Sequence, residues 1–176
     1  MRIIYITIVS ALILSGNILV SSFPVSALAS GSIPFASAFG DNIVNYNKAT
    51  SKVATSGVLS EKGIDQLSKH GFKTIIDLRT KAEGTEAEEK YVKEKGSIKY
   101  INIPFNGASI TDEQLELFTK HVDESEYPLI IHCGSGNRVG AMWSSYRIKK
   151  GIPSDIALEE GFAAGMRKEM LDVIKK

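Results

Sequence analysis

The chain has 176 residues and a formal net charge of +1 at pH 7, with 43% hydrophobic and 8% aromatic residues. This length fits one compact domain behind a targeting segment, and the hydrophobic fraction is enough for a sizeable core. Because the charges balance and no long block of Lys or Arg occurs, nothing in the electrostatics favours nucleic acid as a partner.

The first 29 residues follow the pattern of a secretory signal peptide. Arg2 forms a short positive region, residues 3–20 are largely apolar, and the segment from Ser26 to Ala29 supplies an A-x-A cleavage site. A membrane anchor is the alternative, since the apolar stretch approaches the length of a bilayer span, but small polar residues interrupt it and no charged cluster follows. We therefore expect cleavage before Ser30, a periplasmic or secreted location, and no stable membrane anchor after cleavage.

The remaining chain divides into an N-terminal arm, residues 30–51, and a domain, residues 52–176. The arm is rich in Gly, Ser, Asn and Ala without sustained periodicity. In the domain, hydrophobic patterns predict strands at 52–58, 72–78, 99–103 and 129–131, and helices at 61–70, 85–95, 111–124, 139–150, from 154, and 166–176. The 85–95 and 111–124 helices begin with S/T-x-x-E/Q capping boxes, at Thr85 and Thr111.

Strands that alternate with helices predict an α/β fold with a mainly parallel central sheet flanked by helices. In such sheets, ligands bind beyond the carboxyl ends of the strands. The only cysteine of the chain, Cys133, lies at the end of the most apolar predicted strand.

The sequence around Cys133 combines a buried strand, a glycine-rich turn and a helix start. Gly134 and Gly136 can adopt backbone angles closed to other residues, so that successive N–H groups form an anion-binding nest. A helix N-terminus and a nearby guanidinium favour a thiolate, and Arg138 can hold two oxygens of an oxyanion at once. This combination predicts a nucleophile at the base of an oxyanion cradle. An ordinary buried cysteine would require none of these companions.

The pattern His132-Cys133-x-x-Gly136-x-Arg138 resembles the phosphate-binding loop of cysteine-dependent phosphatases. Segments 71–79, 100–105 and 161–166 are similar to the surroundings of that loop in dual-specificity phosphatases. The nearest resemblance, over about residues 52–170, is to bacterial dual-specificity-phosphatase-like domains, including the one attached to beta-lactamase-hydrolase-like proteins. Segment 55–67 resembles their opening strand and first helix.

The resemblance implies hydrolysis of phosphomonoesters through a phosphocysteine intermediate, with no metal and no cofactor. The substrate would be a phosphorylated protein or a small phosphoester. Cys133 and Arg138 would be catalytic, and the phosphate would be bound by the loop residues Gly134, Ser135, Gly136, Asn137 and Arg138. His132 is a candidate supporting residue that could orient the loop through hydrogen bonds.

Three departures from the phosphatase pattern affect the expected activity. Four residues separate Cys133 from Arg138, where phosphatases usually have five, although the bacterial family tolerates the shorter loop. Val139 stands where a hydroxyl usually assists breakdown of the intermediate. No aspartate follows the Ile-Pro of the preceding strand; Asp112 is the nearest carboxylate, and its place in a first helical turn favours a helix-start charge over an acid.

Two alternatives stay open from the residues. The short loop also resembles that of rhodanese-like sulfurtransferases, which hold a persulfide on the cysteine and need no aspartate acid. A non-catalytic oxyanion-binding module is the third possibility, because the usual acid and hydroxyl are missing. The segments that precede the loop favour the phosphatase over both.

Overall fold

A computed structural model describes residues 32–175 of the chain. The predicted signal peptide and its cleavage site lie outside these residues. Within them, the strands are β1 (Asn47–Lys48), β2 (Val53–Ser56), β3 (Thr74–Asp77), β4 (Lys99–Asn102) and β5 (Leu129–His132). The α-helices are α1 (Glu61–Lys69), α2 (Thr85–Lys95), α3 (Asp112–Glu124), α4 (Asn137–Lys149) and α5 (Ser154–Ala163). Short 3-10 helices are η2 (Ala36–Ala38), η3 (Gly40–Asn42), η4 (Lys81–Glu83) and η5 (Lys168–Val173).

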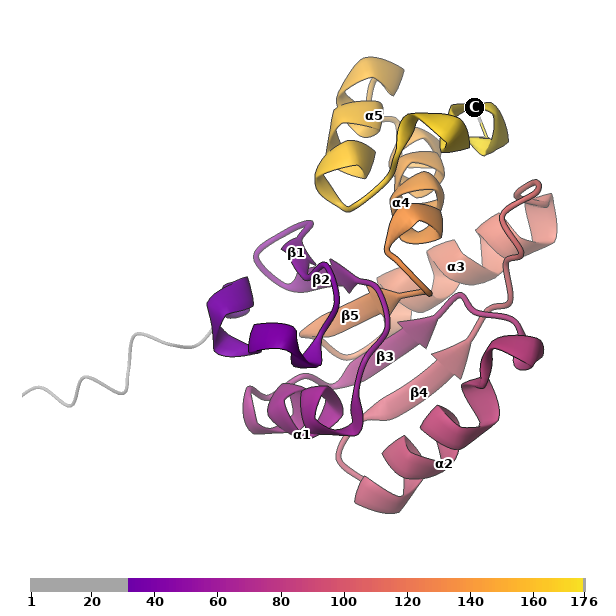
Figure 1. Cartoon of the computed structure of the whole chain (residues 1–176). Coiled ribbons are helices and arrows are strands. Elements are labelled where there is room, and N and C mark those ends of the chain that lie inside the picture. The colour runs from indigo at the N-terminus through magenta and orange to yellow at the C-terminus, as the bar shows by residue number, and fades with distance from the viewer. Residues whose placement is uncertain (1–31, 176) are drawn as a thin grey trace, which may run out of the picture. The chain divides into compact units, whose positions relative to one another are not determined.

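The five strands form one sheet in the order β1-β2-β5-β3-β4. Only β1 runs antiparallel; β2, β5, β3 and β4 are parallel. Figure 1 shows α1 and α2 against one face of this sheet, with α3 and α4 on the other. The predicted α/β fold with a mainly parallel sheet is confirmed.

The central strand β5 leads directly to the cysteine. Neighbouring elements cover both faces and both edges of this strand. All four residues of β5 are buried, which explains why this segment is the most apolar of the domain. In the register, His132 pairs with Ser56 of β2 and with Asp77 of β3. The carboxyl ends of three strands therefore meet where the chain reaches Cys133.

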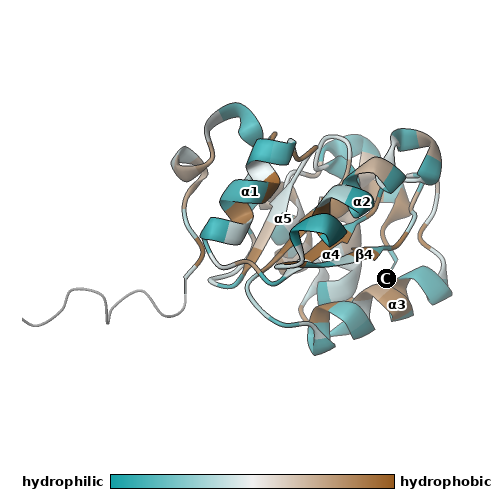
Figure 2. Cartoon of the chain, turned by 90° about the horizontal axis from the view of Figure 1, so that it is seen from below, coloured by the Kyte–Doolittle hydropathy of each residue, from teal (hydrophilic) through white to brown (hydrophobic). Residues whose placement is uncertain are grey.

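Two hydrophobic clusters cover the two faces of the sheet. One joins the sheet to α3, α4 and the C-terminal segment through large side chains such as Phe118, Met142 and Trp143. The other joins it to α1 and α2 through Ile64 and Val92. In Figure 2 the outer surfaces of α1 and α2 are mostly hydrophilic, as expected for helices that bury one face.

The segment expected to be an arm packs into the second cluster. Ile33, Phe39, Ile43 and Tyr46 are all at least nine-tenths buried there. The segment also supplies the edge strand β1, which pairs with β2. The segment 32–48 thus contributes buried side chains to the hydrophobic core.

Two local predictions are wrong. The capping box at Thr85 does not form, because Gly84, with φ 88°, is the residue that precedes α2, and a capping box joins Thr80 and Glu83 one turn earlier. Where an α-helix over residues 166–176 was predicted, the described residues form the 3-10 helix η5, Lys168–Val173. There, the Lys175 N–H donates to the Ser145 hydroxyl on α4, which ties this residue to that helix.

The helix after the cysteine begins earlier than predicted, at Asn137 rather than Val139. The turn therefore leads into α4 without an intervening segment. Among residues 32–175 no helix is both long enough and apolar enough to cross a bilayer.

Candidate active site

Cys133 occupies the point where β5 gives way to the loop that starts α4. Its side chain is fully buried, and its N–H donates to the Ser56 carbonyl of β2 (3.3 Å). The Gly136 N–H points back at the Cys133 Sγ from 3.2 Å. A sulfur that receives a backbone N–H at the start of a helix is in the setting that stabilises negative charge.

The two glycines of the loop differ in their roles. Gly136 has φ 95°, a left-handed conformation that L residues rarely adopt, and it is the residue from which α4 starts. Gly134 lies outside the left-handed region, so the expectation that it needs glycine's freedom is wrong. A Cβ at Gly134 would lie 3.4 Å from the Arg138 Nη2, an ordinary contact. A side chain at position 134 would therefore contact the guanidinium.

Arg138 folds back over the loop and is held in place by two partners. Its Nη1 donates to the Phe105 carbonyl (2.8 Å) and to Glu83 Oε2 (2.9 Å), and its Nη2 donates to Glu83 Oε1 (2.5 Å). The hydrogen bond with Glu83 is the main reason that the pKa of Arg138 is raised, and the nearby Cys133 adds to it. The guanidinium is thus held in a fixed position, and Cys133 lies near enough to contribute to its raised pKa.

Glu83 is held by hydrogen bonds from Thr80, the residue that precedes the 3-10 helix η4. The Thr80 N–H and hydroxyl both donate to Glu83 Oε2 at 2.9 Å. The hydrogen bond from Arg138, followed by those from Thr80, lowers the pKa of Glu83 to about 2, although partial burial opposes the shift. Sequence analysis did not single out Glu83, although Thr80-x-x-Glu83 is itself a capping-box pattern.

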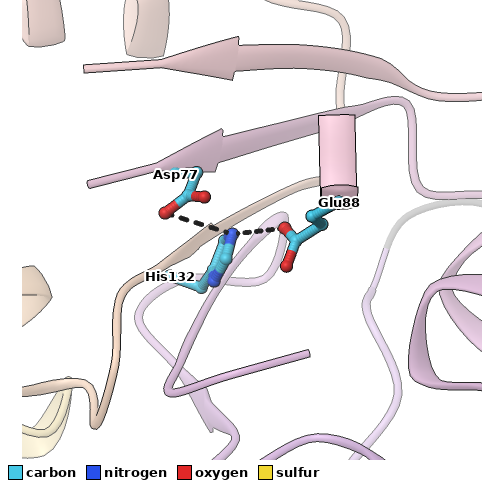
Figure 3. Close-up of side chains that lie close together, drawn as sticks. All are labelled: Asp77, Glu88 and His132. Atoms are coloured by element: carbon cyan, nitrogen blue, oxygen red, sulfur yellow. Dashed lines mark ion pairs between the residues drawn. The ribbon is translucent and has the colours of Figure 1, made fainter. Parts of the chain in front are cut away.

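His132 belongs to a buried polar network behind the loop (Figure 3). Its Nε2 lies 2.8 Å from Glu88 Oε1 on α2 and 3.6 Å from Asp77 Oδ1 on β3. Arg79 bridges the two carboxylates, with Nη2 2.8 Å from Asp77 and 2.6 Å from Glu88. Burial by itself would raise the pKa of Asp77, but hydrogen bonds from Arg79 and from the Tyr100 hydroxyl (2.6 Å) lower it.

The ligand atoms of Asp77, Glu88 and His132 lie within 4.8 Å of one another, a spacing that could suit a metal ion. Arg79 already donates to both carboxylates, so its positive charge occupies the place that a cation would take. The network is better described as an ion-pair support for the end of β5. It links β3, α2 and β5 directly behind Cys133.

The other predicted site residues lie at different places. Ser135 is exposed at the outer side of the loop. The Asn137 side chain accepts a hydrogen bond from the Arg167 N–H (2.7 Å), so it ties the loop to the segment after α5. Asp112 lies in the first turn of α3 and pairs with Lys175 Nζ at 3.0 Å, with its side chain 78% exposed. The helix-start setting expected for Asp112 is the one observed.

The loop after β4, where phosphatases carry their acid, contacts Arg138 without supplying a carboxylate. Phe105 gives its carbonyl to the guanidinium, and a Cβ on Gly107 would touch the Arg138 side chain at 3.6 Å. Between them, Asn106 accepts the Ala108 N–H in a tight turn (2.9 Å). Residues 105–109 contain no acidic side chain.

Residues 32–172 match the family described as "DSP-PTPase phosphatase fused to NAD+ Kinase" (PTP-NADK). The chain belongs to this family. A relative from Xylella fastidiosa, a beta-lactamase hydrolase-like protein, is 29% identical over 101 residues, which cover 54% of this chain and 22% of the relative. A second protein of that name, from Agrobacterium fabrum, is 33% identical over 76 residues, or 41% of this chain and 18% of the relative. This chain therefore spans about a fifth of the length of these relatives. The predicted resemblance to beta-lactamase-hydrolase-like proteins is confirmed.

Solved structures show the same fold at low sequence identity. The nma1982 protein of Neisseria meningitidis superposes with a TM-score of 0.62 at 22% identity, covering 72% of this chain and 96% of that one. TpbA of P. aeruginosa superposes with a TM-score of 0.62 at 18% identity, covering 84% of this chain and 88% of that one. A TpbA variant has also been solved in complex with pTyr, with a TM-score of 0.60. The chain is accordingly a phosphatase-family domain with a PTP-like fold.

Proposed function

We propose that the chain is a cysteine-dependent phosphatase that hydrolyses phosphomonoesters through a phosphocysteine intermediate. The observation that carries this proposal is the arrangement of the Cys133 sulfur, which receives the Gly136 N–H beside the fixed guanidinium of Arg138. A family of phosphatases is the right context for this arrangement.

In the proposed first step, the Cys133 thiolate attacks phosphorus, a P–S bond forms, and the ester P–O bond breaks with its electron pair leaving on the oxygen. Water then attacks phosphorus, the P–S bond breaks, and inorganic phosphate and the thiolate are released. Arg138 and the loop N–H groups stabilise the charge on the equatorial oxygens in both steps. Because Glu83 and the Phe105 carbonyl already hold Arg138, little reorganisation is needed when the substrate arrives.

The leaving group limits the substrates that this site can process. Glu83 is ionised and its carboxylate accepts hydrogen bonds from Thr80 and Arg138, so it is not a proton donor. Asn106 and its neighbours supply no acid. Losing a general acid typically lowers the reaction rate about 10²–10⁴-fold, and the loss is smallest where the leaving group is stable as an anion. Aryl phosphates, phosphotyrosine among them, are therefore the substrates we propose; a related fold binds pTyr.

The test uses the purified, reduced full chain and its Cys133→Ser variant, assayed for aryl-phosphate hydrolysis and for sulfur transfer from thiosulfate to cyanide. We expect phosphate release that disappears in Cys133→Ser. Sulfur transfer without phosphate release would assign the site to the rhodanese type instead. Activity in neither assay, with inorganic phosphate still bound, would favour a binding module.

We also propose that the chain acts outside the cytoplasm, on the strength of the signal-peptide pattern of residues 1–29. N-terminal sequencing of the chain recovered from its native host should begin at Ser30. Recovery of the uncleaved chain in the cytoplasm would contradict export.

A further inference from the structure

Asn45 reaches the catalytic loop from the N-terminal segment, far from it in sequence. Its Nδ2 donates to the Ser135 carbonyl at 3.1 Å, a contact between residues 90 positions apart. The amide orientation is fixed on its other side, because Asn47 Nδ2 lies 3.4 Å from Asn45 Oδ1. The oxygen of the Asn45 amide therefore faces Asn47, and its NH₂ faces the loop.

The packing around Asn45 indicates a fitted position. Asn45 has φ 48°, a left-handed conformation that asparagine tolerates better than most residues. A Cβ on Gly136 would come within 2.9 Å of Asn45 Nδ2, and a Cβ on Gly165 within 3.0 Å. Two glycines thus leave room for this one amide, on the outer side of the loop.

The Ser135 carbonyl and the Gly136 N–H belong to the same peptide unit. In a planar trans peptide, C=O and N–H point in opposite directions. The carbonyl is held outward by Asn45, and the N–H points inward at the Cys133 Sγ (3.2 Å). If this peptide flipped, the carbonyl oxygen would face the sulfur and any bound oxyanion.

The neighbouring peptide is held in a similar way by the backbone. The Gly134 carbonyl accepts the Val58 N–H at 3.3 Å, which turns the Ser135 N–H of that unit to the opposite side. Val58 is itself bonded to Val44 through the Val44 N–H (3.1 Å). The segment that carries Asn45 therefore supports two successive peptide units of the loop.

We propose that Asn45 is a positioning residue: by holding the Ser135 carbonyl outward, it keeps the Gly136 N–H turned toward Cys133 and toward the oxyanion. The catalytic effect of Asn45 rests on the proposed function, whereas its effect on the orientation of the peptide is independent of that function.

Two variants of the full chain test the proposal. Asn45→Gly retains access to the left-handed backbone conformation but removes the donor. Asn45→Asp is isosteric but presents a carboxylate that repels the Ser135 carbonyl at neutral pH. Asn42→Ala is the matched control, because Asn42 Nδ2 donates to the Phe39 carbonyl (3.1 Å) within the same segment and does not reach the loop.

Three properties are measured: hydrogen exchange of the Gly136 amide by NMR, the dissociation constant for inorganic phosphate, and kcat for an aryl phosphate. In both Asn45 variants we expect Gly136 exchange to accelerate, phosphate binding to weaken and kcat to fall, each by about fivefold or more, the factor for one hydrogen bond. In Asn45→Asp the losses should shrink as the pH is lowered through about 4, since a protonated carboxyl can donate again. The control should match the wild type in all three.

Unchanged Gly136 exchange and phosphate binding in a folded Asn45 variant would overturn the proposal. If Asn45→Gly is less stable than the control, the isosteric Asn45→Asp decides through its pH dependence, and losses that do not respond to pH would count against positioning. Should the wild type release no phosphate while Gly136 exchange still responds to Asn45, the proposed function fails and the positioning role stands.

Discussion

At the scale of single residues, the site depends on contacts that bring distant side chains to one loop. Glu83 and Arg138 are 55 positions apart, yet they form a bidentate pair at 2.5 and 2.9 Å. A fixed acid–base pair of this kind orients the guanidinium and leaves the acid unable to donate a proton. The two effects lead to separate predictions.

Replacing Glu83 by Gln should lower kcat/KM for an aryl phosphate by about tenfold, because a charged hydrogen bond to the clamp is lost. The pKa of Glu83 is lowered from 4.5 to about 2, so the ionised pair stabilises the fold fully above pH 4.5 and loses this contribution as the pH falls toward 2. The free energies of unfolding of wild type and Glu83→Gln should therefore differ most at neutral pH and converge in acid. Denaturant titrations at pH 7 and pH 3 check this; a gap that widens in acid would contradict it.

Replacing Asn106 by Asp should restore part of the missing acid. A carboxylate can still accept the Ala108 N–H, so the turn is expected to survive. We expect hydrolysis of alkyl phosphates to rise relative to aryl phosphates, since only poor leaving groups gain from protonation. Equal changes for both substrate classes would show that residue 106 does not reach the leaving group.

At the scale of elements, the unit β5–loop–α4 is where prediction from sequence worked best. The buried strand, the glycine turn and the helix are consecutive, so their local patterns sufficed to predict that Cys133 lies between the strand and the helix. Glu83 and Asn45 were missed because their partners are remote, and local periodicity carries no information on such contacts. Of the capping-box patterns at Thr80 and Thr85, only the first forms, and Gly84 with its left-handed backbone precedes α2 in place of a capping side chain.

Helices α4 and α5 pack so closely that only glycine fits at position 140. A Cβ on Gly140 would collide with the Gly161 carbonyl and would lie 2.6 Å from the Met166 nitrogen. Gly140→Ala should therefore destabilise the fold by about 1–3 kcal/mol, as overpacked cores do. In an unconstrained helix the same change stabilises, so a raised midpoint in chemical denaturation would contradict this packing.

At the scale of the whole molecule, the N-terminal segment contributes both core and site. Its polar composition suggested an arm. A few well-spaced apolar residues of the segment are nevertheless buried in the core. Sparse apolar residues without a helical or strand period are difficult to distinguish from a solvated linker. The mainly parallel sheet, by contrast, followed the expectation for alternating strands and helices.

Phe39→Ala tests how much this segment contributes to stability. Phe39 is 1% exposed and its ring packs on Tyr46 at 4.6 Å and on Phe72 at 6.4 Å between centroids. Removing the ring should lower the free energy of unfolding by about 3–5 kcal/mol, a large part of the stability of a domain of this size. Phe35→Ala is the control, since Phe35 is 73% exposed and should change little. Equal effects of the two changes would show that the segment is not part of the core.

The position of β5 at the centre of the sheet determines how late in synthesis the fold around Cys133 can form. Its neighbours β2 and β3 are synthesised long before it, so the two central pairings close large loops, which slows folding. The Asn137 side chain, at the start of α4, also accepts a hydrogen bond from the Arg167 N–H. A growing chain therefore cannot complete the surroundings of Cys133 until Arg167 has been synthesised.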